Sequence, residues 1–249
     1  MLILDYDGTV TPIVPSPTAA RLAPTVRRTL QRLVAHPRVR VAVLSGRALH
    51  DVRARVAVAG VIYGGCHGLE IDGPGLRFRH PAARPAALRV ARRALTAALA
   101  GIPGVVIEDK RLTLCVHYRR VPSRRHRDVL AAVERVLHAA PGLVGLGGKR
   151  AVELLPRADW DKGRAARWIV ARAAPARRRA VVYVGDDRTD EAAFAALRPR
   201  GITVRVGAGR GTAAYAVPDV RAVRALLRWL ARVMESGGRG ARRSRAGGG

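Results

Sequence analysis

The sequence predicts an α/β protein whose core is a parallel sheet, with an α+β module inserted into it. Two observations support this. β-rich runs alternate with helical patterns near both ends of the chain, and that rhythm changes in the middle. Strands alternating with helices imply parallel strands joined by right-handed crossovers. At 249 residues, 49% of them hydrophobic, the chain is long enough for two packed domains.

The first part of the expected core has the order β-α-β-α-β. Its clearest helix begins near Pro24, a residue that suits a first helical turn, and carries Val26, Leu30, Leu33 and Val34 on one face. We expect strands at 2–6, 39–45 and 61–65, and helices at 24–35 and 48–58.

The inserted module starts after the turn signal "DGPG" at 72–75. In it we expect strands near 76–80, 104–109, 112–118, 143–148 and 151–156, and helices at 85–100 and 123–139. The α/β pattern then resumes with strands at 180–187 and 202–206 and helices from 161, at 189–197 and at 220–234. The expected domains are a core of 1–75 with 157–235, a module of 76–156, and a disordered basic tail of 236–249.

The formal net charge of +28 makes a basic nucleic-acid-associated protein the alternative from another functional class. However, the arginines are spread over every expected helix, and aromatic residues, at 4%, leave little for base stacking. Only Lys110, Lys149 and Lys162 are lysines. We interpret the charge as a chain-wide bias towards arginine and expect no specific nucleic-acid partner.

The sequence also limits the location of the protein. No segment approaches the roughly 20 apolar residues of a membrane span, and Asp5 and Asp7 interrupt the apolar start. We therefore expect a cytoplasmic protein without a membrane partner. Cys66 and Cys115 are too few for a disulfide framework and are expected to be free thiols. Because only four residues precede Asp5, we expect the first strand to fray or the natural start to lie upstream.

Polar residues follow three of the expected strands. Asp5 and Asp7 end the first strand and Ser45 the second, whereas Asp186 and Asp187 end a strand in the second half. Ligands of open parallel sheets bind beyond the carboxyl ends of the strands. Clustered carboxylate oxygens suit Mg²⁺. The sequence therefore predicts a magnesium site at this edge of the sheet.

Four segments carry a family resemblance. They are "DYDGT" at 5–9, "LSGR" at 44–47, "WDKGRA" at 160–165 and "GDDRTDE" at 185–191. In this order they resemble the four motifs of haloacid dehalogenase-like phosphatases. The resemblance implies a Rossmann-like parallel-sheet core with an inserted α+β cap domain of the C2 type.

The same resemblance implies catalysis through an aspartyl-phosphate. Asp5 would be the nucleophile and Asp7 the general acid and base. Ser45 and Lys162 would hold the transferring phosphoryl group. The metal ligands implied are Asp5, the Asp7 carbonyl and Asp186, with Asp187 and Asp190 in support. Gly8 and Thr9 would shape the loop beside the phosphate.

Two further segments narrow the resemblance. "GCHGLEI" at 65–71 and "GKRAVELLP" at 148–156 are similar to segments of trehalose-6-phosphate phosphatases. The resemblance implies trehalose 6-phosphate as substrate and a trehalose-phosphate synthase as a candidate partner. The substrate-binding residues implied, besides those of the phosphate loop, are Gly46, Arg47, His67, Glu70, Lys149 and Glu153.

Several alternatives remain open. A related capped phosphatase could act on sucrose 6-phosphate or a glycosyl-3-phosphoglycerate. Lys149 and Glu153 could form a surface pair, Glu70 could be an exposed strand residue, and His67 could orient a loop. "GDDRTDE" could be a helix N-cap followed by acidic residues that the helix dipole favours.

Overall fold

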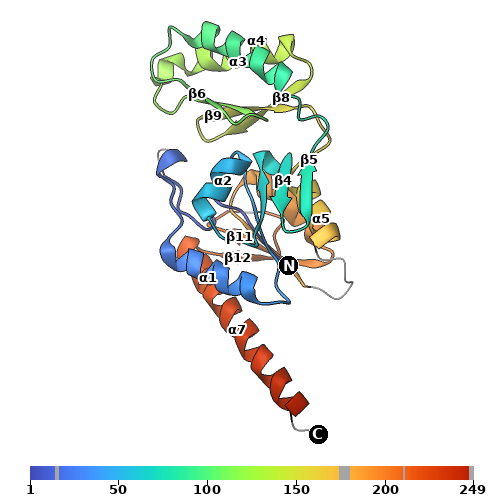
Figure 1. Cartoon of the computed structure of the whole chain (residues 1–249). Helices are drawn as coiled ribbons and strands as arrows, with labels where there is room; N and C mark the ends of the chain where they lie inside the picture. Colours follow the sequence, from blue (N-terminus) through green and yellow to red (C-terminus); the bar gives the residue numbers. More distant parts are fainter. Residues whose placement is uncertain (15–16, 174–179, 210, 247–249) are drawn as a thin grey trace. The chain divides into compact units, whose positions relative to one another are not determined.

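The computed structural model describes residues 1–14, 17–173, 180–209 and 211–246 (Figure 1). The chain divides into two compact units. Unit 1 comprises Met1–Phe78 and Trp160–Gly249, and unit 2 is Arg79–Asp159. The sequence analysis placed these boundaries after residues 75 and 156.

Unit 1 is built on an eight-stranded sheet with the order β12-β11-β10-β1-β2-β3-β4-β5. The strands from β12 to β3 pair in parallel, whereas β4 pairs antiparallel with β3. The bounds are β1 Leu2–Leu4, β2 Val41–Leu44, β3 Ile62–Gly65, β4 Glu70–Gly73, β5 Leu76–Arg79, β10 Val181–Gly185, β11 Gly201–Val206 and β12 Tyr215–Val217. The predicted α/β fold, with a largely parallel sheet, is confirmed.

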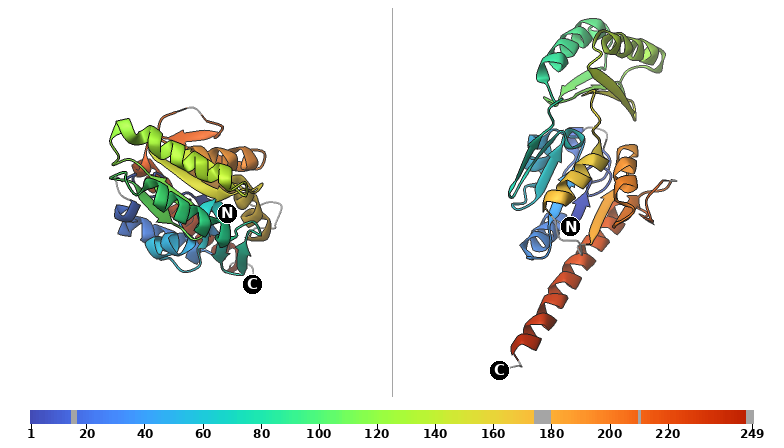
Figure 2. Two further views of the ribbon diagram at one scale, coloured as in Figure 1. Left: turned by 90° about the horizontal axis from the view of Figure 1, so that it is seen from above. Right: turned by 90° about the vertical axis from the view of Figure 1, so that its right-hand side faces the viewer.

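Helices cover both faces of this sheet (Figure 2). Because side chains alternate along a strand, Leu2 and Leu4 of β1 join the core with α1, α2 and α7, and Ile3 packs on the side of α5 and α6. The bounds are α1 Pro24–Ala35, α2 Leu49–Val56, α5 Lys162–Ala173, α6 Arg188–Leu197 and α7 Val220–Ala246, with short 3-10 turns η1 Pro17–Ala19 and η2 Cys66–Gly68.

Unit 2 is a four-stranded antiparallel sheet, ordered β6-β7-β9-β8, with two helices. Leu114 and Val116 of β7 face α3 and α4 in one apolar core. Cys115 and His117 alternate with them and therefore face the opposite side. The bounds are β6 Val106–Asp109, β7 Leu114–His117, β8 Leu143–Gly148, β9 Ala151–Pro156, α3 Pro85–Leu99, α4 His126–Ala139 and a 3-10 turn η3 Ser123–Arg125.

Three elements differ from the sequence expectations. Strands β4 and β12 were not predicted, and α7 continues to Ala246 through most of the tail expected to be disordered. Extending a formed helix costs less than starting one, and alanine and arginine are good helix formers. Residues 247–249 of that tail lie outside the described residues. Among the described residues, no helix is both long and apolar enough to cross a membrane.

Candidate active site

The ends of three neighbouring strands carry the predicted catalytic residues. Asp5 follows β1, and its amide donates to the Val184 carbonyl of β10 at 2.9 Å. Ser45 follows β2, and its amide donates to the Gly64 carbonyl at 2.9 Å. Asp186 follows β10 directly. Since β10, β1 and β2 are adjacent in the sheet, residues far apart in sequence meet at one edge.

Lys162, the first residue of α5, bridges two buried carboxylates. Its Nζ lies 2.7 Å from Asp5 Oδ1 and 2.9 Å from Asp190 Oδ1. The three residues are 3%, 4% and 0% exposed, respectively. Burial by itself would lower the pKa of Lys162, but the charges of Asp190 and Asp5 outweigh it and raise that pKa. Lys162 is therefore a permanent cation at this site.

Asp190 has every carboxylate oxygen engaged by the protein. Oδ1 accepts from Lys162 and from the Tyr183 hydroxyl at 2.7 Å. Oδ2 accepts from the amides of Asp186 and Asp187 at 3.1 and 3.0 Å. Asp190 thus fixes both Lys162 and the loop that carries Asp186. Tyr183 was not predicted as a site residue. The sequence feature that could have indicated it is a polar hydroxyl group in the otherwise apolar strand β10.

Asp187 serves its own helix. Its carboxylate accepts from the Arg188 amide at 2.6 Å, and with Asp190 it forms a capping box at the start of α6. Within "GDDRTDE", the N-cap interpretation therefore applies to Asp187, which is exposed. The predicted support of the metal by Asp187 stays a prediction.

The loop after β1 closes around Asp186. Thr9 Oγ1 donates to Asp186 Oδ1 at 3.2 Å. Gly8 has φ +82°, and a Cβ placed on it would lie 2.0 Å from Asp186 Oδ2. Only glycine gives this backbone conformation without strain and leaves space for the carboxylate.

The carboxylates of Asp5, Asp186 and Asp190 form a cluster that suits a cation. One oxygen of each lies within 4.8 Å of the others. Burial raises the pKa of Asp5 well above its usual value despite the opposing charge of Lys162. Burial, followed by the charge of Asp190, raises the pKa of Asp186 to about 6. Lys162 contacts Asp5 and Asp190 but not Asp186, and Asp190 is engaged by the protein, so a hard divalent cation fits between the oxygens of Asp5 and Asp186.

The Gly8→Ala substitution tests the space beside Asp186. The new methyl group must displace the carboxylate, so we expect the Kd for Mg²⁺, measured by calorimetric titration, to rise about tenfold or more. Gly75→Ala is the matched control, because Gly75 also has a positive φ (+70°) but nothing lies within 4 Å of its added Cβ. An equal change in both variants would attribute the effect to backbone strain.

Asp7 is held by Arg47 rather than by the Lys162 cluster. Arg47 Nε and Nη2 donate to the two Asp7 oxygens, each at 2.7 Å, in a bidentate pair. Arg47 Nη1 also donates to Asp51 Oδ2 at 2.8 Å. Arg47 is 8% exposed, so it is fixed on both sides. Arg47 is predicted from the sequence to lie near the phosphate, whereas Asp51 is not among the predicted site residues.

Ser45, Gly46 and His67 form one tight turn region. Ser45 is buried, and its Oγ accepts from the Arg47 amide at 3.2 Å. The His67 amide donates to the Ser45 carbonyl at 2.9 Å. A Cβ on Gly46 would lie 2.8 Å from His67 Cε1, so only glycine leaves room for the ring. This arrangement favours the loop-orienting interpretation of His67. Glu70 is half-buried at the start of β4.

In unit 2, Glu153 pairs with a residue that was not predicted. Its Oε1 accepts from Lys110 Nζ at 3.0 Å and from Thr113 Oγ1 at 2.6 Å. Lys149 is exposed in the turn between β8 and β9. Glu153 is buried and pairs with Lys110, an arrangement that does not favour the alternative of a surface pair between Lys149 and Glu153. The sequence did contain a signal for this residue, because Lys110 is one of only three lysines in an arginine-rich chain.

The same face of the unit 2 sheet carries a second polar pair. His117 Nε2 lies 2.8 Å from Glu108 Oε2, and this hydrogen bond lowers the pKa of Glu108. Cys115 lies opposite Glu153 in the register of β7 and β9. Burial raises the pKa of the Cys115 thiol to about 12. Cys115 and Cys66 are both free thiols, as predicted.

Known proteins resemble this chain over most of its length. An uncharacterised glycosyl hydrolase of Mycobacterium tuberculosis is 43% identical over 212 residues, which are 82% of this chain and 16% of that protein. A trehalose-phosphate phosphatase of Mycobacterium bovis is 39% identical over 213 residues, 82% of this chain and 53% of that protein. The chain thus spans about half the length of the phosphatase relative and a much smaller part of the hydrolase.

Solved structures share the fold. A trehalose-6-phosphate phosphatase related protein has a TM-score of 0.82 at 23% identity, covering 95% of this chain and 100% of that chain. The C-terminal domain of a Candida albicans trehalose-6-phosphate phosphatase has a TM-score of 0.80 at 22% identity, covering 93% and 92%. The sequence model of the trehalose-phosphatase family matches residues 3–219. This chain therefore belongs to the trehalose-phosphatase family.

Proposed function

We propose that this chain is a Mg²⁺-dependent phosphatase that hydrolyses trehalose 6-phosphate to trehalose and phosphate. The observation that carries the proposal is the buried contact of Asp5 with Lys162 beside Asp186, at the ends of β1 and β10. This contact supports roles for Asp5 as a carboxylate nucleophile, Lys162 as a cation for phosphoryl oxygens and Asp186 as a metal ligand. Membership of the trehalose-phosphatase family supports the sugar-phosphate substrate.

Haloacid dehalogenase-like phosphatases generally use a divalent metal, and one solved structure that shares the fold is a haloacid dehalogenase-like hydrolase of Bacteroides thetaiotaomicron. In this chain Asp5, Asp186 and the Asp7 carbonyl would hold Mg²⁺. We propose Mg²⁺ because the donors are hard oxygens. Asp190 already accepts four hydrogen bonds from the protein, so only a few protein oxygens are left for the metal, as is usual for Mg²⁺. When bound, Mg²⁺ would offset the negative charge that gathers around the phosphoryl group.

The residues of the chain have distinct parts in the reaction. A carboxylate oxygen of Asp5 attacks phosphorus, and the bond between phosphorus and the sugar oxygen breaks. Protonated Asp7 gives its proton to that oxygen. Asp7 then takes a proton from water, whose oxygen attacks phosphorus and releases both the Asp5 carboxylate and phosphate. Arg47 orients Asp7, and Lys162 and Ser45 hold the phosphoryl oxygens.

A substrate panel tests the function. Phosphate release should give trehalose 6-phosphate a higher kcat/KM than sucrose 6-phosphate or a glycosyl-3-phosphoglycerate, in the presence of Mg²⁺. A clearly better alternative substrate would overturn the trehalose assignment. Absence of any Mg²⁺-dependent activity, together with duplex binding that survives physiological salt, would favour the nucleic-acid alternative. A trehalose-phosphate synthase is a candidate partner that co-purification can test.

Glu153→Gln tests the proposed sugar site in unit 2. The amide keeps an acceptor for Thr113 but removes the charge that pairs with Lys110, so hydrogen bonding to a sugar hydroxyl should weaken. We expect kcat/KM to fall about tenfold or more for trehalose 6-phosphate and much less for an aryl phosphate. Glu134→Gln, on an exposed part of α4, is the control. Equal losses on the two substrates would remove Glu153 from the sugar site.

The stabilising effect of Mg²⁺ should depend on pH. The folded chain raises the pKa of Asp186 to about 6, so it favours the protonated form of this carboxyl group. The stability that protonated Asp186 contributes is complete below pH 3.8 and is lost as pH rises through about 6. Mg²⁺ binds the ionised carboxylate, so it should raise Tm more at pH 7.5 than at pH 5. The measurement is Tm with and without Mg²⁺. In Asp186→Asn, Mg²⁺ should raise Tm only slightly and by the same amount at both pH values. A larger rise in the Tm of the unsubstituted chain at pH 5 than at pH 7.5 would contradict the argument.

A further inference from the structure

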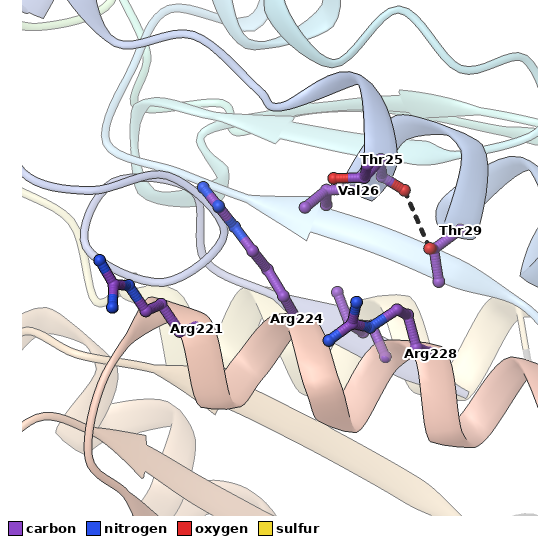
Figure 3. A pocket seen from close by; sticks show the side chains of 7 residues that line it. Thr25, Val26, Thr29, Arg221, Arg224 and Arg228 are labelled. Atoms are coloured by element: carbon purple, nitrogen blue, oxygen red, sulfur yellow. Dashed lines mark hydrogen bonds between the residues drawn. The ribbon is translucent and has the colours of Figure 1, made fainter.

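A pocket of about 290 Å³ lies between α1 and α7 in unit 1 (Figure 3). Its lining includes Thr25 and Thr29 from α1, and Arg221, Arg224 and Arg228 from α7. It contains none of the residues assigned above to catalysis or metal binding. Its volume is slightly below the range of about 300–1,000 Å³ that is usual for drug-sized ligands. Only a small ligand would fit.

Helical spacing gathers the three arginines. Arg221, Arg224 and Arg228 are three and four residues apart, so they lie along one side of α7. The neighbouring side of the helix is anchored by Val223 and Leu227, which are 0% and 1% exposed in the core shared with α1. A packed helix rather than a loop therefore sets the backbone positions of the three arginines, of which Arg221 and Arg228 are exposed and Arg224 is half-buried.

The charge of the pocket is not balanced by protein groups. Its lining has no carboxylate. Within the described residues, the ion pairs and hydrogen bonds of side chains do not include any of these three arginines. The buried Nε of Arg224 has no hydrogen-bond partner there. By contrast, Arg47, Arg55 and other arginines of unit 1 are paired with carboxylates. Three unpaired cations on one wall repel one another, so an anion would stabilise them.

The start of α1 adds to this positive potential. Thr25 lies in the first turn of α1, which has no side-chain cap and no acidic residue. The partial positive charge of a helix N-terminus favours anions. The Thr25 and Thr29 hydroxyl groups add polar atoms on the α1 side of the pocket. Thr29 Oγ1 donates to the Thr25 carbonyl at 2.9 Å (Figure 3).

Arginine abundance alone could place three such residues together. Arg89, Arg92 and Arg93 on α3 of unit 2 line another hollow with Thr96, and Arg92 there pairs with Asp109. The pocket between α1 and α7 differs in two respects, because none of its three arginines pairs with a carboxylate among the described residues and because Thr25, in the first turn of α1, lies in its lining. These differences, rather than the number of arginines, point to a ligand.

We propose that the pocket between α1 and α7 is a second, non-catalytic site for a phosphoryl anion, bound by Arg221, Arg224 and Arg228. Guanidinium groups match phosphate oxygens in bidentate pairs. The shared chemistry is a phosphoryl group, supplied either by inorganic phosphate or by a small sugar phosphate. The site does not depend on the proposed function, because binding needs neither Asp5 nor a metal.

The test is calorimetric titration of the full chain with inorganic phosphate and, separately, with glucose 6-phosphate. EDTA removes divalent cations through which phosphate could bind at the acidic cluster of Asp5, Asp186 and Asp190, and the ionic strength is held constant. The pocket variant carries Arg221→Gln, Arg224→Gln and Arg228→Gln. The control carries Arg89→Gln, Arg92→Gln and Arg93→Gln, which remove the same charge. We expect Kd to increase at least about tenfold in the pocket variant and less than about twofold in the control.

Several results would overturn the proposal. They are an equal loss in both triple variants, an unchanged Kd in the pocket variant, and no binding to the unsubstituted chain at millimolar phosphate. If the pocket triple variant does not fold, Arg224→Lys keeps the charge but removes the guanidinium fork and should still weaken binding. The tighter of the two ligands identifies the source of the phosphoryl group. Because turnover is not measured, failure of the proposed phosphatase function leaves this result unaffected.

Discussion

Asp5→Asn is expected to lower turnover of trehalose 6-phosphate by about four orders of magnitude or more, the scale on which loss of a catalytic nucleophile is measured. The amide cannot attack phosphorus, so no aspartyl-phosphate forms. The fold should persist, because asparagine has the same shape and Lys162 keeps its contact with Asp190 at 2.9 Å. The measurement is phosphate release with Mg²⁺, accompanied by Tm.

The control for Asp5→Asn is Asp128→Asn, which makes the same chemical change on the exposed start of α4. Its turnover should stay close to that of the unsubstituted chain. Borohydride reduction during turnover supplies an independent readout, since it converts an aspartyl-phosphate to homoserine that mass spectrometry can locate at position 5. Turnover of Asp5→Asn within tenfold of the control would reject the covalent route.

The proximity of Asp5 and Asp186 could be predicted from sequence because both residues follow strands. Asp5 and Asp186 end parallel strands, and parallel strands present their carboxyl ends to the same edge of a sheet. The order of the four motifs then places Lys162 at the start of a helix that reaches this edge. The sequence alone does not show which protein groups bind the oxygens of each carboxylate. Asp190 and Asp187 are both acidic residues of one motif, yet one holds Lys162 and the other caps α6.

Contacts across strands were harder to predict. Glu153 meets Lys110 and Thr113 because β9 pairs with β7 in one particular register. A shift by one residue would turn Glu153 to the helix side of the sheet. The sequence alone does not determine that register, so Lys110 could not be identified as the partner of Glu153. Similarly, the bidentate pair of Arg47 with Asp7 depends on the rotamers of both side chains.

Short edge strands were missed for a different reason. β12 has three residues, and β4 includes Asp72 and Gly73, which are poor strand formers. Each forms because a neighbouring strand offers backbone donors and acceptors, as β3 does for β4. Local propensity therefore contains little information about them. The disorder expected for the tail was also judged from local composition, whereas α7 supplies an existing helix that can be extended to Ala246.

Lys162→Met is expected to have the largest effect on stability. It removes the cation between Asp5 and Asp190, which are 4% and 0% exposed, and leaves both carboxylates buried beside each other. Breaking a buried ion pair by removing one partner costs about 3–5 kcal/mol. The free energy of unfolding, measured by urea denaturation without metal, should fall by about that amount. Turnover should also fall steeply, because Lys162 no longer offsets charge on the phosphoryl oxygens.

A double substitution separates the two roles of Lys162. In Lys162→Met with Asp190→Asn, one uncompensated charge is removed, so the loss of stability should be smaller than the sum of the single losses. Turnover should not recover, because phosphoryl transfer still lacks the cation. Mg²⁺ should also stabilise Lys162→Met more than the unsubstituted chain, since a carboxylate cluster without its lysine attracts a divalent cation more strongly. Weaker stabilisation by Mg²⁺ in Lys162→Met would mean that Lys162 does not share the carboxylates that hold the metal.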